Sequence, residues 1–563
     1  MATKTTAEKL AAIQKGYALE GATIELGAAI VDGELQKDAP VRLPLSMMNR
    51  HGLVAGATGT GKTVTLHMMA EQLSTAGVPV FLADIKGDLS GLATAATASE
   101  KLAARTDSIG QAWSGKTFPV EFLALGGDGN GVPVRATVTS FGPILLSRVM
   151  ELNDTQESSL QLVFHFADKN NLELIDLKDL RSVIQFLTSA EGKDALEDLG
   201  GLSKATAGVI LRELVTLEAQ GMKRFFGEPE FDTAELMRTA PDGRGVITCL
   251  ELPTLQSKPM VFSTFLMWLL ADLFEDLPEA GDLDKPKLVF FLDEAHLLFN
   301  GASKAFLDAI TTTVRLIRSK GVGIFFVTQT PKDVPADVLG QLANRVQHAL
   351  RAFTPEDAKA LKATVSTFPI SDYDLEETLT SAGIGEAVIT VMNEKGAPTP
   401  VAHTRLRAPE SVMGPSADDL IKSTVAGSAL LAKYGTAVDN VSAYEKLAGK
   451  AAAPTGGAAP GEPPVPAGSQ DADVDAEARR IEEEILGRPS SRPAPTRDNA
   501  PRPPAEAPRA PRQDAGGGMM DDLGGVLGGA LGGGLKSMAR SIGTQIGREL
   551  LRGVFGTSSR RRR

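Results

Sequence analysis

Short, unbroken apolar runs alternate with stretches of helical periodicity along most of the chain. Three runs, residues 78–84, 287–293 and 321–328, hold at least four apolar residues and end in a polar or acidic side chain. Such runs are typical of strands that are buried on both faces of a parallel sheet. Residues 64–73 and 262–274 carry apolar positions at helical spacing. This β-α-β order predicts an α/β fold with a mainly parallel sheet between layers of helices.

The chain before residue 48 has a weaker pattern. Residues 1–20 indicate a polar helix, and residues 22–44 alternate weakly around the turn Asp32-Gly33. We expect a few short strands there, too few for an independent barrel. The segment 1–47 is therefore predicted to be an N-terminal helix followed by short strands.

The main domain is expected to span residues 48–447 and to contain a helical insertion. From about residue 143 to residue 240 the pattern is mainly helical, and Asn153 offers an N-cap with carboxylates in the turn that follows. Apolar strand-like runs lie on both sides of this segment, so we expect it to interrupt the α/β domain.

Two further segments follow the main domain. Residues 448–534 are rich in Pro, Ala and Gly, a composition that cannot bury a core and predicts a disordered linker. In residues 535–563, apolar residues lie three or four apart, and eight basic residues accompany one acid, Glu549. A basic amphipathic helix of this kind can pack on its own oligomer, dock on a partner, contact nucleic acid or lie on an anionic membrane. The sequence leaves these alternatives open.

Charge and composition narrow the function classes. The net charge of −12 argues against a nucleic-acid binder that is basic throughout, but not against contacts confined to a pore. A single cysteine, Cys249, excludes an intrachain disulfide framework and fits a reducing compartment. The N-terminus is mixed in charge and unlike a signal peptide, and the apolar stretch 259–271 is shorter than the about 20 residues of a membrane-spanning helix. We expect a cytoplasmic location.

A glycine-rich loop at residues 56–63 carries the first chemical signal. It fits the pattern G-x-x-x-x-G-K-[ST] at every fixed position and lies between a short apolar run and a helical one. Glycines let the backbone wrap around a polyphosphate, and the following helix N-terminus favours the same anion. The residues expected to bind ATP are Gly56, Ala57, Thr58, Gly59, Thr60, Gly61, Lys62, Thr63 and Val64. Lys62 would reach the β- and γ-phosphates and Thr63 would bind Mg²⁺. The alternative is a glycine-rich turn with a chance Lys-Thr.

Adjacent carboxylates supply the second signal. The run 287–293 ends at Asp293, and Glu294 follows it directly. In a P-loop ATPase the first carboxylate holds Mg²⁺, usually through water, and the second polarises the attacking water. The alternative is a buried strand that ends in surface acids. Residues 293–296 spell Asp-Glu-Ala-His, the letters of another helicase superfamily, but any strand of this type can end in this way.

Other polar residues are expected near the same sheet edge. Gln329 follows the run 321–328 and can hydrogen-bond both the γ-phosphate and the attacking water, or simply cap the strand. Asp84 and Lys86 follow the run 78–84, where open α/β sheets bind ligands. Their plainer interpretation is a helix cap and a solvated charge.

Arginines are candidates for a further role. Phosphoryl transfer in oligomeric ATPases commonly uses an arginine from a neighbouring subunit. Arg315 and Arg318 lie just before the run 321–328, and Arg345 and Arg351 lie after it. We prefer the first pair, although any one arginine can equally be a surface charge.

Together these motifs resemble the HerA/FtsK superfamily of ATPases and, more narrowly, the bacterial HerA-like proteins of the YjgR type. The resemblance covers nearly the whole chain apart from residues 450–530. The stretches that carry it are 48–63, 84–88, 152–157, 288–296, 328–329, 442–445 and 540–556.

The resemblance implies a RecA-like P-loop core, often arranged as a hexameric ring that moves DNA or protein through its pore. It implies that Lys62 and Thr63 act on nucleotide and Mg²⁺, Asp293 and Glu294 on metal and water, Gln329 as a sensor, and Arg315 or Arg318 as the arginine finger. HerA itself carries a substantial N-terminal β-barrel, which residues 1–47 are too short to form in full. Processing of DNA with a partner nuclease is therefore not implied.

Three function classes follow. The leading one is a cytoplasmic ATPase that forms a ring and translocates or unwinds DNA. The second is a nucleotide-dependent scaffold or protein-remodelling ATPase that does not act on DNA. The third, a small-molecule kinase, is disfavoured by the long helical segment and the candidate arginine finger.

Overall fold

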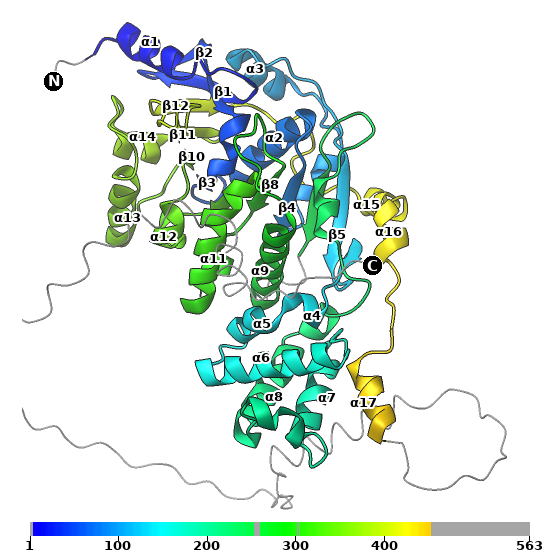
Figure 1. Ribbon diagram of the computed structural model, residues 1–563. Helices are drawn as coiled ribbons and strands as arrows, with labels where there is room; N and C mark the ends of the chain where they lie inside the picture. Colours follow the sequence, from blue (N-terminus) through cyan, green and yellow to red (C-terminus); the bar gives the residue numbers. More distant parts are fainter. Residues whose placement is uncertain (1–3, 253–258, 301, 303, 452–563) are drawn as a thin grey trace, which may run out of the picture. The chain divides into compact units, whose positions relative to one another are not determined.

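The computed structural model describes residues 4–252, 259–300, 302 and 304–451, and twelve of its strands form one sheet (Figure 1). The strands are β1 (Thr23–Val31), β2 (Glu34–Pro44), β3 (Gly52–Ala55), β4 (Val80–Asp84), β5 (Val120–Leu125), β6 (Val132–Val134), β7 (Ile247–Glu251), β8 (Leu288–Leu292), β9 (Val322–Thr328), β10 (Asn344–His348), β11 (Glu386–Thr390) and β12 (Ala402–Leu406). Their order is β2-β1-β12-β11-β10-β3-β9-β8-β4-β7-β5-β6.

Helices connect and cover these strands. They are α1 (Thr6–Gly16), α2 (Lys62–Thr75), α3 (Glu100–Ile109), α4 (Val138–Phe141), α5 (Pro143–Val149), α6 (Asp154–Lys169), α7 (Leu177–Thr188), α8 (Lys204–Ala219), α9 (Pro259–Asp276), α10 (His296–Phe299), α11 (Lys304–Ile317), α12 (Ala336–Leu339), α13 (Pro355–Val365), α14 (Leu375–Ser381), α15 (Asp418–Ala426), α16 (Ala429–Tyr434) and α17 (Ala443–Ala451). Among the described residues, no helix is both long and apolar enough to cross a membrane.

The strands from β10 to β6 run parallel to one another, which confirms the expected α/β fold with a mainly parallel sheet. The strands from β2 to β11 are joined to this part by antiparallel pairs. Because the parallel strands share one direction, their carboxyl ends form a single edge. β9 lies between β3 and β8, so residues that follow these three strands are neighbours along that edge.

The unbroken apolar runs arise because each of the strands β4, β8 and β9 contributes to two cores. In β8, Phe290 belongs to the core on one face and Phe291 to the core on the other. The first core also holds Trp268 of α9 and Val314 of α11, and the second holds Leu66 of α2. Helices thus cover both faces of the sheet, as successive side chains of a strand point in opposite directions.

The N-terminal strands extend the central sheet. β1 and β2 are nine and eleven residues long, longer than the short strands that the weak alternation predicts. β1 pairs with β12, and its register against β2 shifts between Glu25 and Gly27 and again between Ala28 and Ala29. These irregularities break the period of two, which explains why the sequence pattern is weak.

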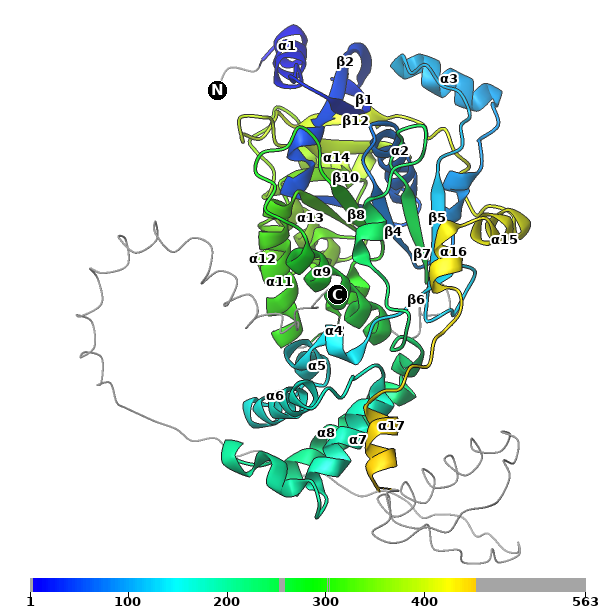
Figure 2. The ribbon, with the colours of Figure 1, turned by 45° about the vertical axis from the view of Figure 1, so that its right-hand side comes forward.

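Helices of residues 143–240 continue the first core. Asn153 is the N-cap of α6, where it forms a capping box with Gln156. Figures 1 and 2 both show α17 beside α7, and two hydrogen bonds hold them together. Asp179 accepts one from the Ser442 hydroxyl and one, 3.0 Å long, from the Tyr444 N–H. The chain that follows the sheet therefore returns to these helices.

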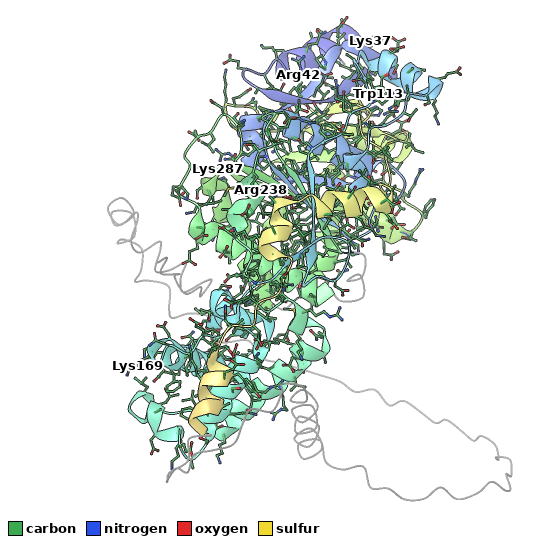
Figure 3. All side chains as sticks on the ribbon, turned by 90° about the vertical axis from the view of Figure 1, so that its right-hand side faces the viewer. Lys37, Arg42, Trp113, Lys169, Arg238 and Lys287 are labelled. Atoms are coloured by element: carbon green, nitrogen blue, oxygen red, sulfur yellow. The ribbon has the colours of Figure 1, made fainter. Side chains whose placement is uncertain are left out.

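Side chains outside the strands also contact the sheet and its flanking segments, and Figure 3 labels two of them, Trp113 and Arg238. Arg238, before β7, contacts Glu121 of β5 at 2.8 Å, and the Trp113 Nε1–H donates to the Pro409 carbonyl at 2.7 Å. Residues 448–451, expected in the linker, belong to α17 instead. The rest of that predicted linker and the predicted helix at 535–563 lie outside the described residues.

Candidate nucleotide-binding site

The glycine-rich loop joins β3 to α2 at the carboxyl edge of the parallel strands. Gly59 and Gly61 have φ values of 77° and 112°, in the left-handed region that glycine adopts at little cost. Gly61 is also the N-cap residue of α2, so the unpaired N–H groups of the first helical turn face the loop. A backbone of this shape offers several N–H donors to one anion.

Neighbouring strands hold this loop in place. The Gly56 N–H donates to the carbonyl of Thr328, the last residue of β9, at 3.2 Å. The Thr60 carbonyl accepts the Gly385 N–H at 3.0 Å, just before β11. Arg105 of α3 in turn donates to the Gly385 carbonyl at 2.8 Å. The loop is therefore supported by chain segments far from it in sequence.

Lys62 is buried beneath the loop. Its Nζ donates to the Gly56 carbonyl at 2.7 Å and to the Ala57 carbonyl at 3.3 Å. Burial lowers the pKa of Lys62, while the charges of Glu294 and Asp293 act in the opposite direction. The strand order β3-β9-β8 places the glycine-rich loop and the two carboxylates on the same edge of the sheet, which agrees with this effect of their charges on Lys62.

His348, at the end of β10, packs behind the loop. Its Nε2 lies 2.9 Å from the Thr65 hydroxyl of α2, and a Cβ added to Gly56 would lie 2.4 Å from the His348 Cβ. Burial, with a smaller effect from Lys62, lowers the pKa of His348 to about 4, so the ring is neutral at pH 7. Nothing in the local sequence pattern singles out this histidine, because only the pairing of β10 with β3 places it here.

Asp293 and Glu294 follow β8 directly, and both are buried. The Asp293 Oδ1 accepts the Glu294 N–H at 2.9 Å. Burial raises the pKa of Asp293 to about 6, although the charge of Lys86 acts to lower it. Glu294 has a φ of 47°, a left-handed conformation that costs a non-glycine residue about 1–3 kcal/mol and is often found at functional sites.

The Glu294 carboxylate lies between two basic side chains. Its Oε1 forms an ion pair with Lys86 Nζ. Its Oε2 lies 3.2 Å from His296 Nδ1, yet this buried atom makes no hydrogen bond of normal geometry with any described residue. Burial acts to raise the pKa of Glu294, but Lys86, His296 and Lys62 outweigh it and the pKa is lowered.

The contacts of Asp84 and Lys86 in the loop after β4 decide between the two interpretations of these residues. Asp84 accepts the N–H groups of Gly87 at 2.6 Å and Leu89 at 2.8 Å, so its carboxylate caps the turn. Lys86 pairs with Glu294 instead of standing free in solvent. The plainer interpretation therefore holds for Asp84, whereas Lys86 belongs to the site.

Gln329 lies directly after β9, between the glycine-rich loop and Asp293 along the sheet edge. Its side chain is exposed, and the preceding Thr328 is tied down by a hydrogen bond of 2.8 Å to Asp333. The position suits a residue that senses a group bound at the loop.

The structure does not bring Arg315 and Arg318 to this edge. Both are exposed and precede β9, so they lie near the amino end of this strand. Since β9 has seven residues, its amino end is about 23 Å from its carboxyl end. Arg345 begins β10 at the same amino edge and donates to the Thr367 carbonyl at 3.4 Å. Arg351 is exposed and lies beyond β10, on the carboxyl side.

The side chains at the carboxyl edge suit a nucleotide with Mg²⁺. The partly exposed Thr63 hydroxyl and the Asp293 carboxylate are the hard oxygen ligands that this ion prefers. In the described part of the chain, no three His, Cys, Asp or Glu side chains are grouped to hold a metal by themselves. In nucleotide sites, Mg²⁺ is commonly bound by one or two carboxylates together with substrate phosphates and water.

Comparison with known proteins identifies the family. Residues 30–503 match the family described as helicase HerA-like C-terminal. The chain belongs to this family. This HerA-like chain is also 22% identical over 363 residues to the DNA double-strand break repair helicase HerA of Saccharolobus solfataricus. That match covers 63% of this chain and 64% of the length of the relative.

Solved structures were also found to match the HerA-like chain. The plasmid coupling protein TrwB, in complex with a non-hydrolysable ATP analogue, has a TM-score of 0.47 at 15% identity, with 73% of this chain and 96% of that chain covered. VirB4 of Thermoanaerobacter pseudethanolicus has a TM-score of 0.43 at 14% identity, with 69% and 97% covered. Family membership confirms the expected resemblance to the HerA/FtsK superfamily of P-loop ATPases. Members of that superfamily use ATP with Mg²⁺.

Proposed function

We propose that this HerA-like chain hydrolyses ATP and works as a motor. One observation carries the proposal: the glycine-rich loop follows β3, Asp293 and Glu294 follow β8, and only β9 lies between these parallel strands, so the two motifs lie on one edge of the sheet. The donors of the loop and the carboxylates after β8 thus lie along one stretch of the carboxyl edge of the sheet. Phosphoryl transfer to water needs this combination of anion binding and a nearby base.

Each residue has a separate task in this mechanism. Lys62 would exchange the Gly56 and Ala57 carbonyls for oxygens of the β- and γ-phosphates. The Thr63 hydroxyl, and Asp293 through water, would hold Mg²⁺, whose charge would balance that of the phosphate oxygens.

Glu294 is the residue proposed to activate the attacking water. Glu294 would accept the proton of this water as its oxygen bonds to the γ-phosphorus and the bond to ADP breaks. Gln329, between the loop and Asp293, would orient that water and sense the γ-phosphate.

We further propose a ring-shaped oligomer, with a hexamer as the expected form. Arg315 and Arg318 are exposed at the amino edge of the sheet, remote from the nucleotide site of their own chain. An arginine in this position can complete only the site of a neighbouring chain, as the finger of oligomeric ATPases does. The arrangement supports catalysis between subunits.

DNA translocation or unwinding is the proposed use of this motor. The support is the relative described as a DNA repair helicase, to which this chain is 22% identical. A protein-remodelling or scaffold function is the alternative. The net charge of −12 is in its favour, because it argues against a DNA-binding surface that is basic throughout the chain.

Steady-state ATPase assays separate these functions. We would compare the wild-type protein with Glu294→Gln, with and without double-stranded DNA, over a salt series. A DNA motor should be stimulated by DNA, should lose the stimulation as salt displaces the phosphate contacts, and should need Glu294. Hydrolysis that needs Glu294 but ignores DNA would favour protein remodelling, and no hydrolysis in the wild-type protein would contradict the motor.

The basic segment 535–563, outside the described residues, is proposed to dock on the oligomer, on a partner or on a membrane surface. Removal of this segment should leave the ATPase rate of the core unchanged and alter only that association. A reducing compartment such as the cytoplasm suits the buried thiol of Cys249.

A further inference from the structure

The proposed base, Glu294, is already engaged by a neighbouring loop. Lys86 lies two residues after β4, and β4 pairs directly with β8, which ends two residues before Glu294. The Lys86 ammonium group pairs with Oε1 of Glu294. The Lys86 side chain is 43% exposed, whereas the Glu294 side chain is only 10% exposed. The pair therefore joins a buried carboxylate to a lysine that solvent can reach.

This ion pair affects the task proposed for Glu294. A carboxylate that accepts a charge-assisted hydrogen bond is held in one orientation, and the bonded oxygen is a weaker acceptor for a proton from water. The other oxygen, Oε2, faces His296. Both carboxylate oxygens of Glu294 thus already lie next to basic side chains.

The loop that carries Lys86 has its own anchor on the protein. Asp84 caps the turn, and Gly87 has a φ of 79°, a conformation that allows the chain to reverse after Lys86. Ser90, just beyond the turn, accepts the Ser416 N–H at 3.0 Å. The position of Lys86 therefore depends on a segment that is remote in sequence from both motifs.

We propose that Lys86 is a positioning residue that restrains Glu294 and so limits ATP hydrolysis until its loop moves away. The inference rests on the proposed ATPase function and deepens it. Lys62 is held beneath the phosphate loop and Lys86 is held on the base, so the two lysines have different tasks. Loss of Lys86 should free Glu294 without removing a phosphate contact.

The test is the ATPase of the full-length protein with Lys86→Met, which keeps the length of the side chain and removes its charge. We expect the unstimulated kcat to rise about two- to fivefold, the upper part of the range of one partly exposed ion pair, while KM for ATP stays within about twofold. Lys86→Arg should retain the wild-type rate because it can form the same pair. Lys332→Met removes an exposed lysine from the same edge and should change neither constant.

A double substitution shows whether Lys86 acts through Glu294. In the Glu294→Gln background, Lys86→Met should leave the residual rate unchanged. A fall in kcat with a rise in KM would mean that Lys86 binds phosphate and would overturn the inference, as would an unchanged kcat. Because the wild-type protein would still hydrolyse ATP in both cases, these results differ from a failure of the proposed function, in which the wild-type protein has no activity.

Discussion

Asp84 of β4 and Glu251 of β7 are register partners at the carboxyl edge of the sheet, and both carboxyl groups are buried. Burial, with a further contribution from Asp84, raises the pKa of Glu251 to about 8. Oε1 of Glu251 has no hydrogen-bond partner among the described residues. Ionising Glu251 beside Asp84 is therefore costly, and the pair makes stability depend on pH.

Replacement of Glu251 by Gln should remove part of this dependence. The pKa of Glu251 is about 8 in the folded chain against an ordinary value of 4.5. The stability that the neutral form provides is therefore complete below about pH 4.5 and is lost as pH rises through 8. Glu251→Gln should match the wild-type protein near pH 5 and be more stable at pH 8 by about 1–3 kcal/mol.

Urea unfolding at pH 5, 6.5 and 8 measures this difference. The control is Glu356→Gln, a change at an exposed carboxylate of α13. Its free energy of unfolding should equal that of the wild-type protein at every pH. Equal pH dependence in the wild-type protein and Glu251→Gln would show that Glu251 is ionised in the folded chain.

Lys62→Ala should weaken nucleotide binding. The ammonium group would lose charge-assisted hydrogen bonds to phosphate, worth about 1.5–3 kcal/mol, which corresponds to roughly a 10- to 100-fold loss of affinity. Titration with a fluorescent ATP analogue measures this loss. Lys101→Ala, at an exposed site on α3, should bind as the wild-type protein does. Unchanged nucleotide affinity in Lys62→Ala would show that Lys62 does not contact the phosphates.

His348 should support the phosphate loop through Thr65. His348→Leu fills a similar volume but removes the hydrogen bond to the Thr65 hydroxyl. One buried hydrogen bond is worth about 0.5–1.5 kcal/mol, so we expect nucleotide affinity to fall about 2- to 12-fold. Thr65→Val should cause a similar loss of affinity. The double variant should bind nucleotide no more weakly than the single variant with the lower affinity. Additive losses would mean that the two side chains act independently.

The arginine finger can be tested by mixing subunits. Arg315→Ala or Arg318→Ala should lower hydrolysis by at least about 100-fold while nucleotide binding is retained, because each acts at a neighbouring site. Mixing the inactive variant with Glu294→Gln protein should restore some activity, since one interface in such a mixed ring combines an intact base with an intact arginine. Arg212→Ala, an exposed change on α8, should behave as wild type. Failure of both variants to reduce activity would exclude these two residues and favour Arg351.

Local signals in the sequence predict much of the candidate site. The glycine spacing of residues 56–63 and the carboxylates after an apolar run predict chemistry because each group is contiguous in sequence. The parallel sheet follows as well, since strands buried on both faces require unbroken apolar runs. Strand β1 was harder to recognise, because bulges against β2 disturb its alternation.

The sequence by itself predicts which residues would bind phosphate, because a phosphate loop needs glycines and a lysine at fixed local spacing. It also determined the class of the sheet through the apolar runs. Only the tertiary structure decided that His348 supports the loop, that Lys86 pairs with Glu294, and that Arg315 and Arg318 lie at the opposite edge. The reason is the strand order, which is set by non-local packing of whole strands and which no local pattern encodes.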